Sequence, residues 1–427
     1  MWSYYVVLEI SFALLFTLMD QTSIKIGRHS VLPKSEIKLA SSKSESNRVL
    51  LLDALAGSGS NLHNLSSARD THIMKGLLSS NDETLDVKDA GTVMRFMTGF
   101  LTLSEQPRIL TGTDRMCNRP IGLLVDALNS IGADIKYLGK TGYPPLQISG
   151  TGKQTLNHLE IPGNISSQYI SALLMIAPKL PLGLEINLVG DVYSLPYIKM
   201  TLSLMSKFGI EYEFKNNKIS IQPQDYVSSE YTVESDWSGA SYWYSIVALS
   251  EKAEIKLLGL REDSYQGDSA IVEIMDALGV NSEFTADGVL LTKKPHSDKF
   301  SYDFRNCPDL AQTIIAIGAA KGIELEMTGL ESLRIKETDR TAAMATEVAK
   351  IGAKLYAEDE KTWKLIPAES INWPEGLTFD TYEDHRMAMA LAPIATLHNI
   401  VVDDPKVVRK SYPEYWEHLQ SVGFQIN

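Results

Sequence analysis

A helix–turn–strand unit recurs along this chain and constrains its fold more than any other feature. Five apolar, helix-like segments each end at a glycine that is followed by a short strand-like run. These glycines lie 77, 70, 73 and 71 positions apart, and they are Gly132, Gly209, Gly279, Gly352 and Gly423. Glycine directly after a helix supplies the left-handed C-terminal cap. Self-similarity at this period indicates a repeated α/β unit.

A second series lies between these glycines, and each member is a polar turn that opens onto a strongly apolar helical segment. Helices this apolar belong inside a domain, with sheets outside them. The series indicates six copies of the unit, three in each domain. Its members are 44–55, 91–101, 166–176, 235–249, 308–320 and 384–394.

The length of 427 residues favours two domains of roughly 200 residues each. The midpoint of the repeats falls near Glu234 and Ser235. An extended stretch up to about Ala40 precedes the first repeat, and from the residues alone it could add a strand to either half.

The net charge of −13 argues against nonspecific binding of nucleic acid and makes each local cluster of cations more informative. Two cysteines, Cys117 and Cys307, cannot form a disulfide framework, and no His/Cys spacing typical of a metal site occurs. We therefore expect a cytoplasmic protein without a metal or a cofactor.

The first 18 residues are apolar and aromatic, but Glu9 interrupts them and no Lys or Arg precedes Lys25. They lack the cationic start of a signal peptide and are shorter than the about 20 apolar residues of a membrane span. We expect residues 1–18 to be an uncertain N-terminal extension, with Met19 as the working start. A peripheral membrane contact is the alternative, and no membrane partner is expected for the rest.

The stretch from Lys43 to Arg48 places cations, hydroxyls and an amide directly before an apolar helix. The exposed N–H groups and the dipole at a helix start favour an anion. Ser44 or Ser46 could cap the helix, and an ordinary cap with solvated charges is the alternative reading.

Further polar clusters stand at comparable positions, and each also has a structural explanation as a cap, a solvated loop or a surface ion pair. Gly91 would let a ligand approach the backbone closely at a helix start. Lys336 and Arg340 are four residues apart, which places them on one helical face if the segment is helical. The clusters are 89–95, 113–120, 166–168, 336–340, 384–386 and 409–410.

Taken in order, these clusters closely resemble the 5-enolpyruvylshikimate-3-phosphate (EPSP) synthase family, from about Ile37 to the C-terminus. The matching strings are SKSESNR (42–48), DAGTVMR (89–95), SSQ (166–168), RIKETDR (334–340), DHRMAM (384–389) and DPK (404–406). The resemblance implies an α/β fold of two similar domains. Each has three βαβαββ units with buried helices and outer sheets, in agreement with the sixfold repeat.

The resemblance also implies domain boundaries and an assembly. One domain is expected to cover 41–234, and the other to combine 19–40 with 235–427. Family members close the two domains around their ligands. A monomer is the family default.

The reaction of the family, as the resemblance implies it, transfers the enolpyruvyl group of phosphoenolpyruvate to the 5-hydroxyl of shikimate 3-phosphate. Phosphate is released by addition and elimination through a tetrahedral intermediate, as a step of aromatic amino-acid biosynthesis. Both substrates are polyanions, so binding them side by side requires many fixed cations and hydrogen-bond donors.

The motif matches carry the family's binding residues onto this chain. The residues expected to hold shikimate 3-phosphate are Lys43, Ser44, Arg48, Ser166, Ser167, Gln168, Ser194, Asp309 and Lys336. Those expected to hold phosphoenolpyruvate are Lys43, Gly91, Arg115, Gln168, Arg340, Arg386 and Lys410.

Four residues are the expected catalytic groups. Asp309 is the expected base for the 5-hydroxyl, because a carboxylate oriented in a closed site can accept that proton. Lys43 and Glu337 are the candidates for proton transfer at the methylene carbon. We expect His385 to position Glu337 or the phosphate.

The chain departs from the family pattern at a few positions. Asp89 stands where many members have Asn, Phe96 where many have Pro, Arg69 in place of an acidic residue, and Ser332 where Asn is frequent. Phe96 follows the Gly91 turn, so we expect it to bear on inhibitors such as glyphosate more than on turnover.

Two other functions compete with this one. UDP-N-acetylglucosamine 1-carboxyvinyltransferases share the fold and the phosphoenolpyruvate chemistry, but they carry a catalytic Cys in a glycine-rich loop. Cys117 has no glycines directly ahead of it and lies two residues before Arg119. A phosphate-ester-binding module without activity is the second alternative, and the intact set of Lys43, Asp309 and Glu337 disfavours it.

Overall fold

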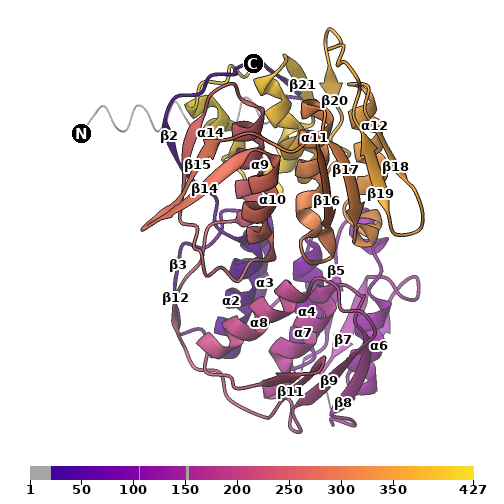
Figure 1. Ribbon diagram of the computed structural model, residues 1–427. Helices are drawn as coiled ribbons and strands as arrows, with labels where there is room; N and C mark the ends of the chain where they lie inside the picture. Colours follow the sequence, from indigo (N-terminus) through magenta and orange to yellow (C-terminus); the bar gives the residue numbers. More distant parts are fainter. Residues whose placement is uncertain (1–20, 105, 151–152) are drawn as a thin grey trace. The chain divides into compact units, whose positions relative to one another are not determined.

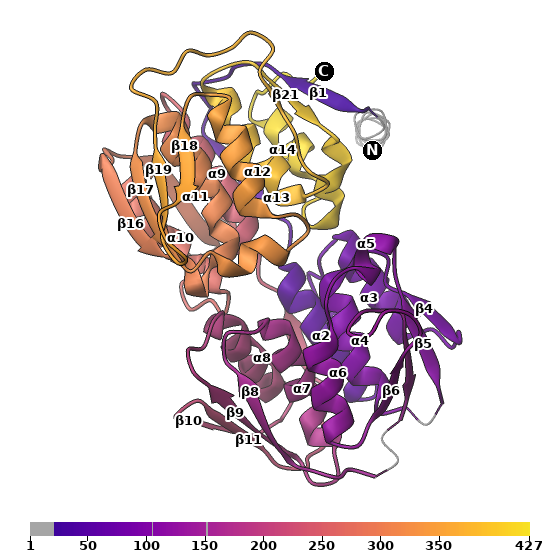
Figure 2. The ribbon, with the colours of Figure 1, turned by 90° about the vertical axis from the view of Figure 1, so that its right-hand side faces the viewer.

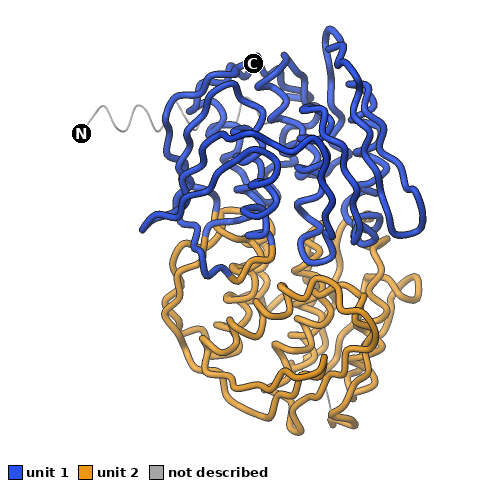
Figure 3. The backbone as a smooth tube through the Cα atoms, viewed as in Figure 1, with its two compact units in different colours: residues 1–40, 235–264, 268–427 blue, residues 41–234, 265–267 orange. Residues whose placement is uncertain are grey.

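The computed structural model describes residues 21–104, 106–150 and 153–427, and the expected extension over 1–18 lies outside them. Its contacts divide the chain into two compact units (Figure 3). Unit 1 holds the described part of 1–40 together with 235–264 and 268–427, and unit 2 holds 41–234 and 265–267.

These units differ from the expected domains only in the short segment 265–267. It was expected with 235–427, but it belongs to unit 2. Its side-chain contacts explain its position. Gln266 is buried, and its amide nitrogen lies 3.3 Å from a carboxylate oxygen of Glu45 and 3.1 Å from one of Glu234. Both carboxylates belong to unit 2, so these contacts hold the segment there.

Unit 2 contains two four-stranded sheets and a two-stranded one. The four-stranded sheets have the orders β4-β5-β7-β6 and β10-β11-β9-β8, and β12 pairs with β3. The strands are β3 (Asn61–His63), β4 (Thr84–Asp86), β5 (Arg108–Thr111), β6 (Asp134–Tyr137), β7 (Leu146–Ser149), β8 (His158–Pro162), β9 (Leu184–Val189), β10 (Glu213–Lys215), β11 (Lys218–Ile221) and β12 (Glu230–Thr232).

The more apolar helices of unit 2 lie between its two four-stranded sheets (Figure 2). Most residues of α4 and α7 are buried, and those two helices pack against each other. The helices are α2 (Lys43–Leu55), α3 (Arg69–Leu78), α4 (Gly91–Leu101), α5 (Asp114–Cys117), α6 (Gly122–Ser130), α7 (Ser167–Ile176) and α8 (Leu195–Lys207), and a 3-10 turn, η1, covers Ala177–Lys179.

Unit 1 contains a three-stranded sheet, β1-β21-β20, and two four-stranded sheets, β14-β15-β13-β2 and β16-β17-β19-β18. The stretch before Ala40 supplies β1 and β2 to this unit, which decides between the two halves that the sequence left open. The strands are β1 (Ser23–Ile26), β2 (Ser35–Lys38), β13 (Glu254–Leu258), β14 (Val280–Thr285), β15 (Gly288–Lys293), β16 (Lys299–Asp303), β17 (Glu324–Thr328), β18 (Lys354–Ala357), β19 (Trp363–Ile366), β20 (Thr378–Phe379) and β21 (Ile400–Asp403).

Unit 1 also keeps an apolar helix inside, since every residue of α9 is buried. Figure 1 shows this helix beside α10. The helices are α9 (Trp237–Leu249), α10 (Ile271–Leu278), α11 (Ala311–Lys321), α12 (Arg340–Ala349), α13 (His385–Leu391) and α14 (Tyr415–Ser421). The 3-10 turns are η2 (Gly267–Ala270), η3 (Phe304–Asn306), η4 (Pro308–Leu310), η5 (Glu331–Ile335), η6 (Ala392–Thr396) and η7 (Pro405–Lys410).

The four-stranded sheets of both units share one pairing pattern, in which one parallel pair is extended by two antiparallel strands. In unit 2 the parallel pairs are β4 with β5 and β8 with β9. In unit 1 they are β16 with β17 and β2 with β13. This recurrence of one unit, with helices inside and sheets outside, confirms the fold that the repeats predict.

The glycines that define the repeat all have a positive φ, between 83° and 109°. Strands follow four of them, as expected, although β10 begins only at Glu213, four residues after Gly209. The strand expected after Gly423 is wrong in extent. Only a single bridge forms there, between Ile426 and Ile26, although the backbone of 425–427 also hydrogen-bonds to Lys25 and Gly27.

No helix within the described ranges is long and apolar enough to cross a membrane.

Candidate active site

Apart from Lys410, the predicted residues of unit 1 lie at or just before the starts of three helices, α11, α12 and α13. Asp309 belongs to η4, directly before α11. Asp339 caps α12 by accepting the N–H of Ala342 at 3.0 Å, and Asp384 caps α13 by accepting the N–H of Arg386 at 2.9 Å. These caps fix the polar turns that open onto the apolar helices, as the repeat predicts.

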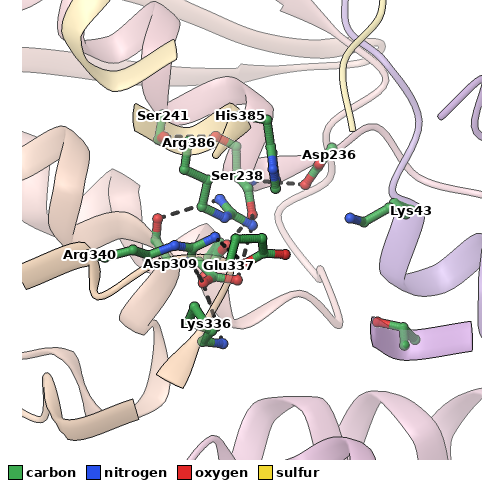
Figure 4. A network of polar contacts seen from close by, with 12 residues as sticks. Lys43, Asp236, Ser238, Ser241, Asp309, Lys336, Glu337, Arg340, His385 and Arg386 are labelled. Atoms are coloured by element: carbon green, nitrogen blue, oxygen red, sulfur yellow. Dashed lines mark hydrogen bonds and ion pairs between the residues drawn. The ribbon is translucent and has the colours of Figure 1, made fainter. Parts of the chain in front are cut away.

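Arg340 is the centre of this cluster (Figure 4). It is 2% exposed, and its guanidinium contacts three carboxylates: Asp384 at 2.7 Å, Asp309 at 2.9 Å and Glu337 at 2.9 Å. Burial would lower the pKa of Arg340, but the three carboxylates raise it above its usual value. Arg340 is therefore a permanent buried cation that joins the starts of all three helices.

The expected helical face shared by Lys336 and Arg340 is wrong. The segment 336–339 is not helical, because Asp339 caps α12 and the helix begins only at Arg340. Both cations nevertheless reach the same carboxylate oxygen of Asp309, with Lys336 Nζ at 3.7 Å.

Asp309 is held by three cations, since Arg386 Nη2 lies 3.0 Å from its second oxygen. Burial alone would raise the pKa of Asp309, but Arg386, Lys336 and Arg340 together hold it well below its usual range. In this arrangement Asp309 is ionised and its negative charge is compensated.

Glu337 joins Lys410 to the same network. Lys410, which lies in η7 and is 5% exposed, places its Nζ 3.3 Å from Glu337 Oε1. The buried ring of His385 begins α13, with Nδ1 3.6 Å from Asp384 Oδ1. The structure thus brings together all seven residues predicted in unit 1: Asp309, Lys336, Glu337, Arg340, His385, Arg386 and Lys410.

The predicted residues of unit 2 begin at the start of α2. Lys43 is the first residue of the helix, and its Nζ lies 3.1 Å from Asp70 Oδ2 on α3. The expected cap at Ser44 or Ser46 is wrong. Ser42 caps the helix by accepting the N–H of Glu45, because the helix already begins at Lys43, six residues before the apolar run that starts at Val49.

Arg48 lies inside unit 2 and is 2% exposed. Its guanidinium donates to Thr201 Oγ1 at 2.7 Å, Ser44 O at 2.9 Å and Ser171 Oγ at 3.1 Å. Its Cζ also lies 5.2 Å from the centre of the Phe96 ring. Burial lowers the pKa of Arg48 to about 10, so it stays a cation at neutral pH.

The starts of α4 and α7 carry the next predicted set. Gly91 is the first residue of α4, and a Cβ there would lie 2.8 Å from Arg119 Nη1. Ser166 caps α7, and Gln168 donates to Thr92 Oγ1 across the two helices at 3.0 Å. Ser167 stands between them as the first residue of α7. Two adjacent helix starts therefore present hydroxyl, amide and backbone N–H groups.

Arg115 and Ser194 are the remaining predicted residues of unit 2. Arg115 was expected in a loop, but it lies in the short helix α5, which Thr113 caps. Ser194 precedes α8 with a φ of 54°, a left-handed conformation that is uncommon for a residue other than glycine.

Two of the departures from the family pattern contact each other. Arg69 and Asp89 form an ion pair on unit 2, so the cation at one position accompanies the added carboxylate at the other. Phe96 packs under the guanidinium of Arg48, which links this departure to a predicted substrate-binding residue.

Four polar residues that support the site were not named from the sequence as site residues. Asp384 and Asp70 are the carboxylate partners of Arg340 and Lys43, and Ser171 and Thr201 are the acceptors for Arg48. A polar residue inside an otherwise apolar helix was the available signal for Ser171 and Thr201. For Asp384 the signal was a charged residue at the start of a helix predicted to be buried.

Comparison with known proteins gives a consistent result. Residues 75–419 match the family EPSP synthase (3-phosphoshikimate 1-carboxyvinyltransferase). A 3-phosphoshikimate 1-carboxyvinyltransferase of Bacteroides fragilis is 45% identical over 398 residues, which cover 92% of this chain and 96% of the relative. Another, of Aliivibrio salmonicida, is 37% identical over 420 residues, covering 91% and 96%.

The fold is likewise similar to a solved one. The EPSP synthase of Acinetobacter baumannii superposes with a TM-score of 0.76 over 95% of this chain and 100% of its own, at 19% sequence identity.

Proposed function

This chain belongs to the EPSP synthase (3-phosphoshikimate 1-carboxyvinyltransferase) family, and from this membership we propose its reaction and the residues that perform it. The enzyme transfers the enolpyruvyl group of phosphoenolpyruvate to the 5-hydroxyl of shikimate 3-phosphate and releases phosphate. The observation that carries the assignment of residues is the buried network around Arg340, which joins Asp309, Glu337 and Asp384 in unit 1.

In the first step, addition, the 5-hydroxyl oxygen bonds to C2 of phosphoenolpyruvate, and a proton is delivered to the methylene carbon C3. Asp309 accepts the hydroxyl proton. Either Glu337 or Lys43 delivers the proton to C3, and His385 positions Glu337 or the phosphate.

In the second step, elimination, a proton leaves C3, the C2–C3 double bond re-forms, and the C2–O bond to phosphate breaks. The group that protonated C3 can take the same proton back. The proton that Asp309 accepted from the hydroxyl passes to the released phosphate, so Asp309 is ionised again and the two steps exchange no net proton with the protein.

The negative charge of Asp309 is compensated by three cations, which affects its strength as a base. A carboxylate whose pKa lies well below its usual range is a weak base. The substrates bring a phosphate and a carboxylate, which attract Arg386, Lys336 and Arg340 in turn. Sharing these cations with the substrates raises the basicity of Asp309 at the moment when a proton must be accepted.

The substrate-binding roles follow the chemistry of each cluster. The hydroxyl, amide and cationic groups of unit 2 suit the phosphate and hydroxyls of shikimate 3-phosphate, and they are Lys43, Ser44, Arg48, Ser166, Ser167, Gln168 and Ser194. Asp309 and Lys336 complete that set. Phosphoenolpyruvate is held by Lys43, Gly91, Arg115, Gln168, Arg340, Arg386 and Lys410.

Measuring phosphate release from phosphoenolpyruvate tests this function. Release that depends on shikimate 3-phosphate is the expected result. Release that instead depends on UDP-N-acetylglucosamine would assign the chain to the other carboxyvinyltransferase, and no release with either acceptor would leave a binding protein.

We further propose a cytoplasmic monomer that needs neither a metal nor a cofactor. Both cysteines of the chain are free thiols, which suits a reducing compartment. Light scattering of the purified protein checks the monomer, and phosphate release after dialysis against EDTA checks the metal. Activity lost on dialysis and restored by a divalent ion would contradict the proposal.

A further inference from the structure

Asp268 is a buried carboxyl group of unit 1 that the proposed reaction does not use. It lies in η2 and is 2% exposed. Its Oδ2 accepts a hydrogen bond from the hydroxyl of Ser238. Its Oδ1 is buried and has no hydrogen-bond partner among the described residues. A carboxyl group with a single hydroxyl donor is costly to bury in its charged form, so its presence calls for an explanation.

Ser238 connects Asp268 to the predicted active site. The Ser238 hydroxyl lies 3.3 Å from Arg386 Nη2, and the same nitrogen lies 3.0 Å from Asp309 Oδ2 (Figure 4). Ser238 itself is held at the start of α9, where its N–H donates to Asp236 at 3.0 Å. The chain of contacts therefore runs from Asp268 through a fixed hydroxyl to Arg386.

The protonation state of Asp268 sets the direction of these hydrogen bonds. A hydroxyl has one proton to donate, and Arg386 can only donate. When Asp268 is ionised, the Ser238 proton points to the carboxylate and its lone pairs face Arg386. When Asp268 is protonated, it can donate to Ser238, whose own proton must then turn elsewhere beside the guanidinium.

The groups around Asp268 keep both states accessible near neutral pH. Burial raises the pKa of Asp268 to about 7, and the charges of Asp309 and Asp236 add to this effect. Arg386 and the hydrogen bond from Ser238 act in the opposite direction. The nearby Cys307 thiol is neutral at this pH, because burial raises its pKa above the usual range.

We propose that Asp268 is a positioning residue for Arg386. In its ionised form, and through the Ser238 hydroxyl, it orients the guanidinium for the carboxylate of phosphoenolpyruvate. This inference rests on the proposed function, because Arg386 is assigned to that substrate there. Asp268 acts through Ser238 and does not itself touch the substrate.

The kinetics of Asp268→Asn across pH test the proposal. The amide keeps the shape of the side chain but cannot ionise. At pH 8 we expect kcat/KM for phosphoenolpyruvate to fall about tenfold, mainly through KM, as loss of one hydrogen bond to a charged group implies. The two enzymes should converge as the pH falls to 6, where wild-type Asp268 is protonated as well.

The matched control is Asp276→Asn, an exposed carboxyl group of unit 1 whose side chain is 65% exposed. It should follow the wild-type profile throughout. Equal kcat/KM for wild type and Asp268→Asn at pH 8, or a deficit that is the same at pH 6 and pH 8, overturns the proposal. Wild-type enzyme without any turnover would overturn the proposed function instead.

A double-mutant cycle tests the route through Ser238. Ser238→Ala removes the hydroxyl, so we expect a similar rise in KM for phosphoenolpyruvate at pH 8. Adding Asp268→Asn to Ser238→Ala should then change KM little. Additive effects of the two substitutions would show that Asp268 does not act through Ser238. If Asp268→Asn does not fold, Ser238→Ala alone decides, and an unchanged KM overturns the proposal.

Discussion

The polar residues at the helix starts of unit 1 are mostly ionised, whereas those of unit 2 are mostly neutral hydroxyl and amide groups. In unit 1, Arg340 and Asp384 are 2% and 0% exposed and face each other. In unit 2, Gln168 contacts Thr92, and buried Arg48 donates to hydroxyls and a carbonyl rather than to a carboxylate. Unit 1 holds compensated charges before any ligand arrives, while unit 2 offers oriented donors with a few cations.

Because of this difference, removing a side chain should have different effects on stability and activity in the two units. Deleting one partner of a buried ion pair leaves an uncompensated charge, which costs stability as well as activity. Deleting a hydroxyl or amide costs about one hydrogen bond. Substitutions in unit 1 should therefore affect the rate and the fold, and those in unit 2 should mainly affect binding.

Removing the proposed base has the largest expected effect. Asp309→Ala should lower kcat by about 10³-fold or more, since general-base catalysis contributes roughly 10²–10⁴-fold and the substitution also leaves three cations without their carboxylate. Phosphate-release kinetics measure this loss, and circular dichroism shows whether the fold is kept. Asp287→Ala, at a carboxyl group that is 58% exposed, is the control. A near-normal kcat would remove Asp309 from the mechanism.

Removing the central cation should destabilise unit 1. Arg340→Ala leaves Asp309, Glu337 and Asp384 without their shared partner, so we expect the free energy of unfolding to fall by about 3–5 kcal/mol. Urea denaturation measures it. The control is Arg28→Ala, which breaks an exposed pair with Glu251 and should change stability by less than about 1 kcal/mol. Equal effects of the two variants would refute the contrast between buried and exposed charges.

A binding effect is expected from Arg48→Lys in unit 2. Lysine keeps the positive charge but cannot reproduce the fork that reaches Thr201, Ser171 and Ser44. We expect the KM for shikimate 3-phosphate to rise roughly 10-fold or more, with a smaller change in kcat. The partly exposed Arg108→Lys is the matched control. A large loss of kcat at unchanged KM would contradict the division between the units.

The pH dependence of stability distinguishes the buried carboxyl group of Asp268. Its folded pKa is raised to about 7, so it contributes stability that is present at low pH and lost as pH rises from about 4 to about 7. The amide of Asp268→Asn lacks this loss. The melting temperature of the variant minus that of wild type should therefore increase from pH 5 to pH 7. A difference that decreases over this range would contradict the raised pKa.

The smallest effect is expected at the exposed ion pair of unit 2. Arg69 and Asp89 are 49% and 25% exposed, so water screens their attraction. A double-mutant cycle with Arg69→Ala and Asp89→Asn should give a coupling free energy of about 0.2–1 kcal/mol. A coupling as large as the effect of Arg340→Ala would show that exposure does not separate the two kinds of pair.

Much of the fold could be predicted from the sequence, because the residues that define the repeat determine the local backbone conformation. A glycine with positive φ is a common C-terminal cap of a helix, so Gly132 and its counterparts mark the same turn in each repeat. The lengths of the strands were less predictable. The segment after Gly423 pairs with the end of β1 through backbone hydrogen bonds to Lys25 and Gly27, yet it forms a single bridge rather than a full strand.

The residues of the site could also be predicted from the sequence, but the contacts between their side chains could not. The clusters named Arg340 and Arg386, and the family resemblance named Asp309, whereas the contacts among them depend on how three helices pack. The sequence placed Lys336 and Arg340 on one helix, and only the cap at Asp339 shows that the helix begins later. Asp268 lies in no cluster, because its partner Ser238 is 30 residues away.

The pairing of β1 with β21 bears on how the chain folds as it leaves the ribosome. Residues 41–234 form nearly all of unit 2 and are synthesised without interruption, so this half can collapse first. Ser23–Ile26 must wait for Ile400–Asp403, which are made almost last. Until then the first strand is an unpaired edge open to other chains, and a chaperone that shields it during synthesis would raise the yield of native enzyme.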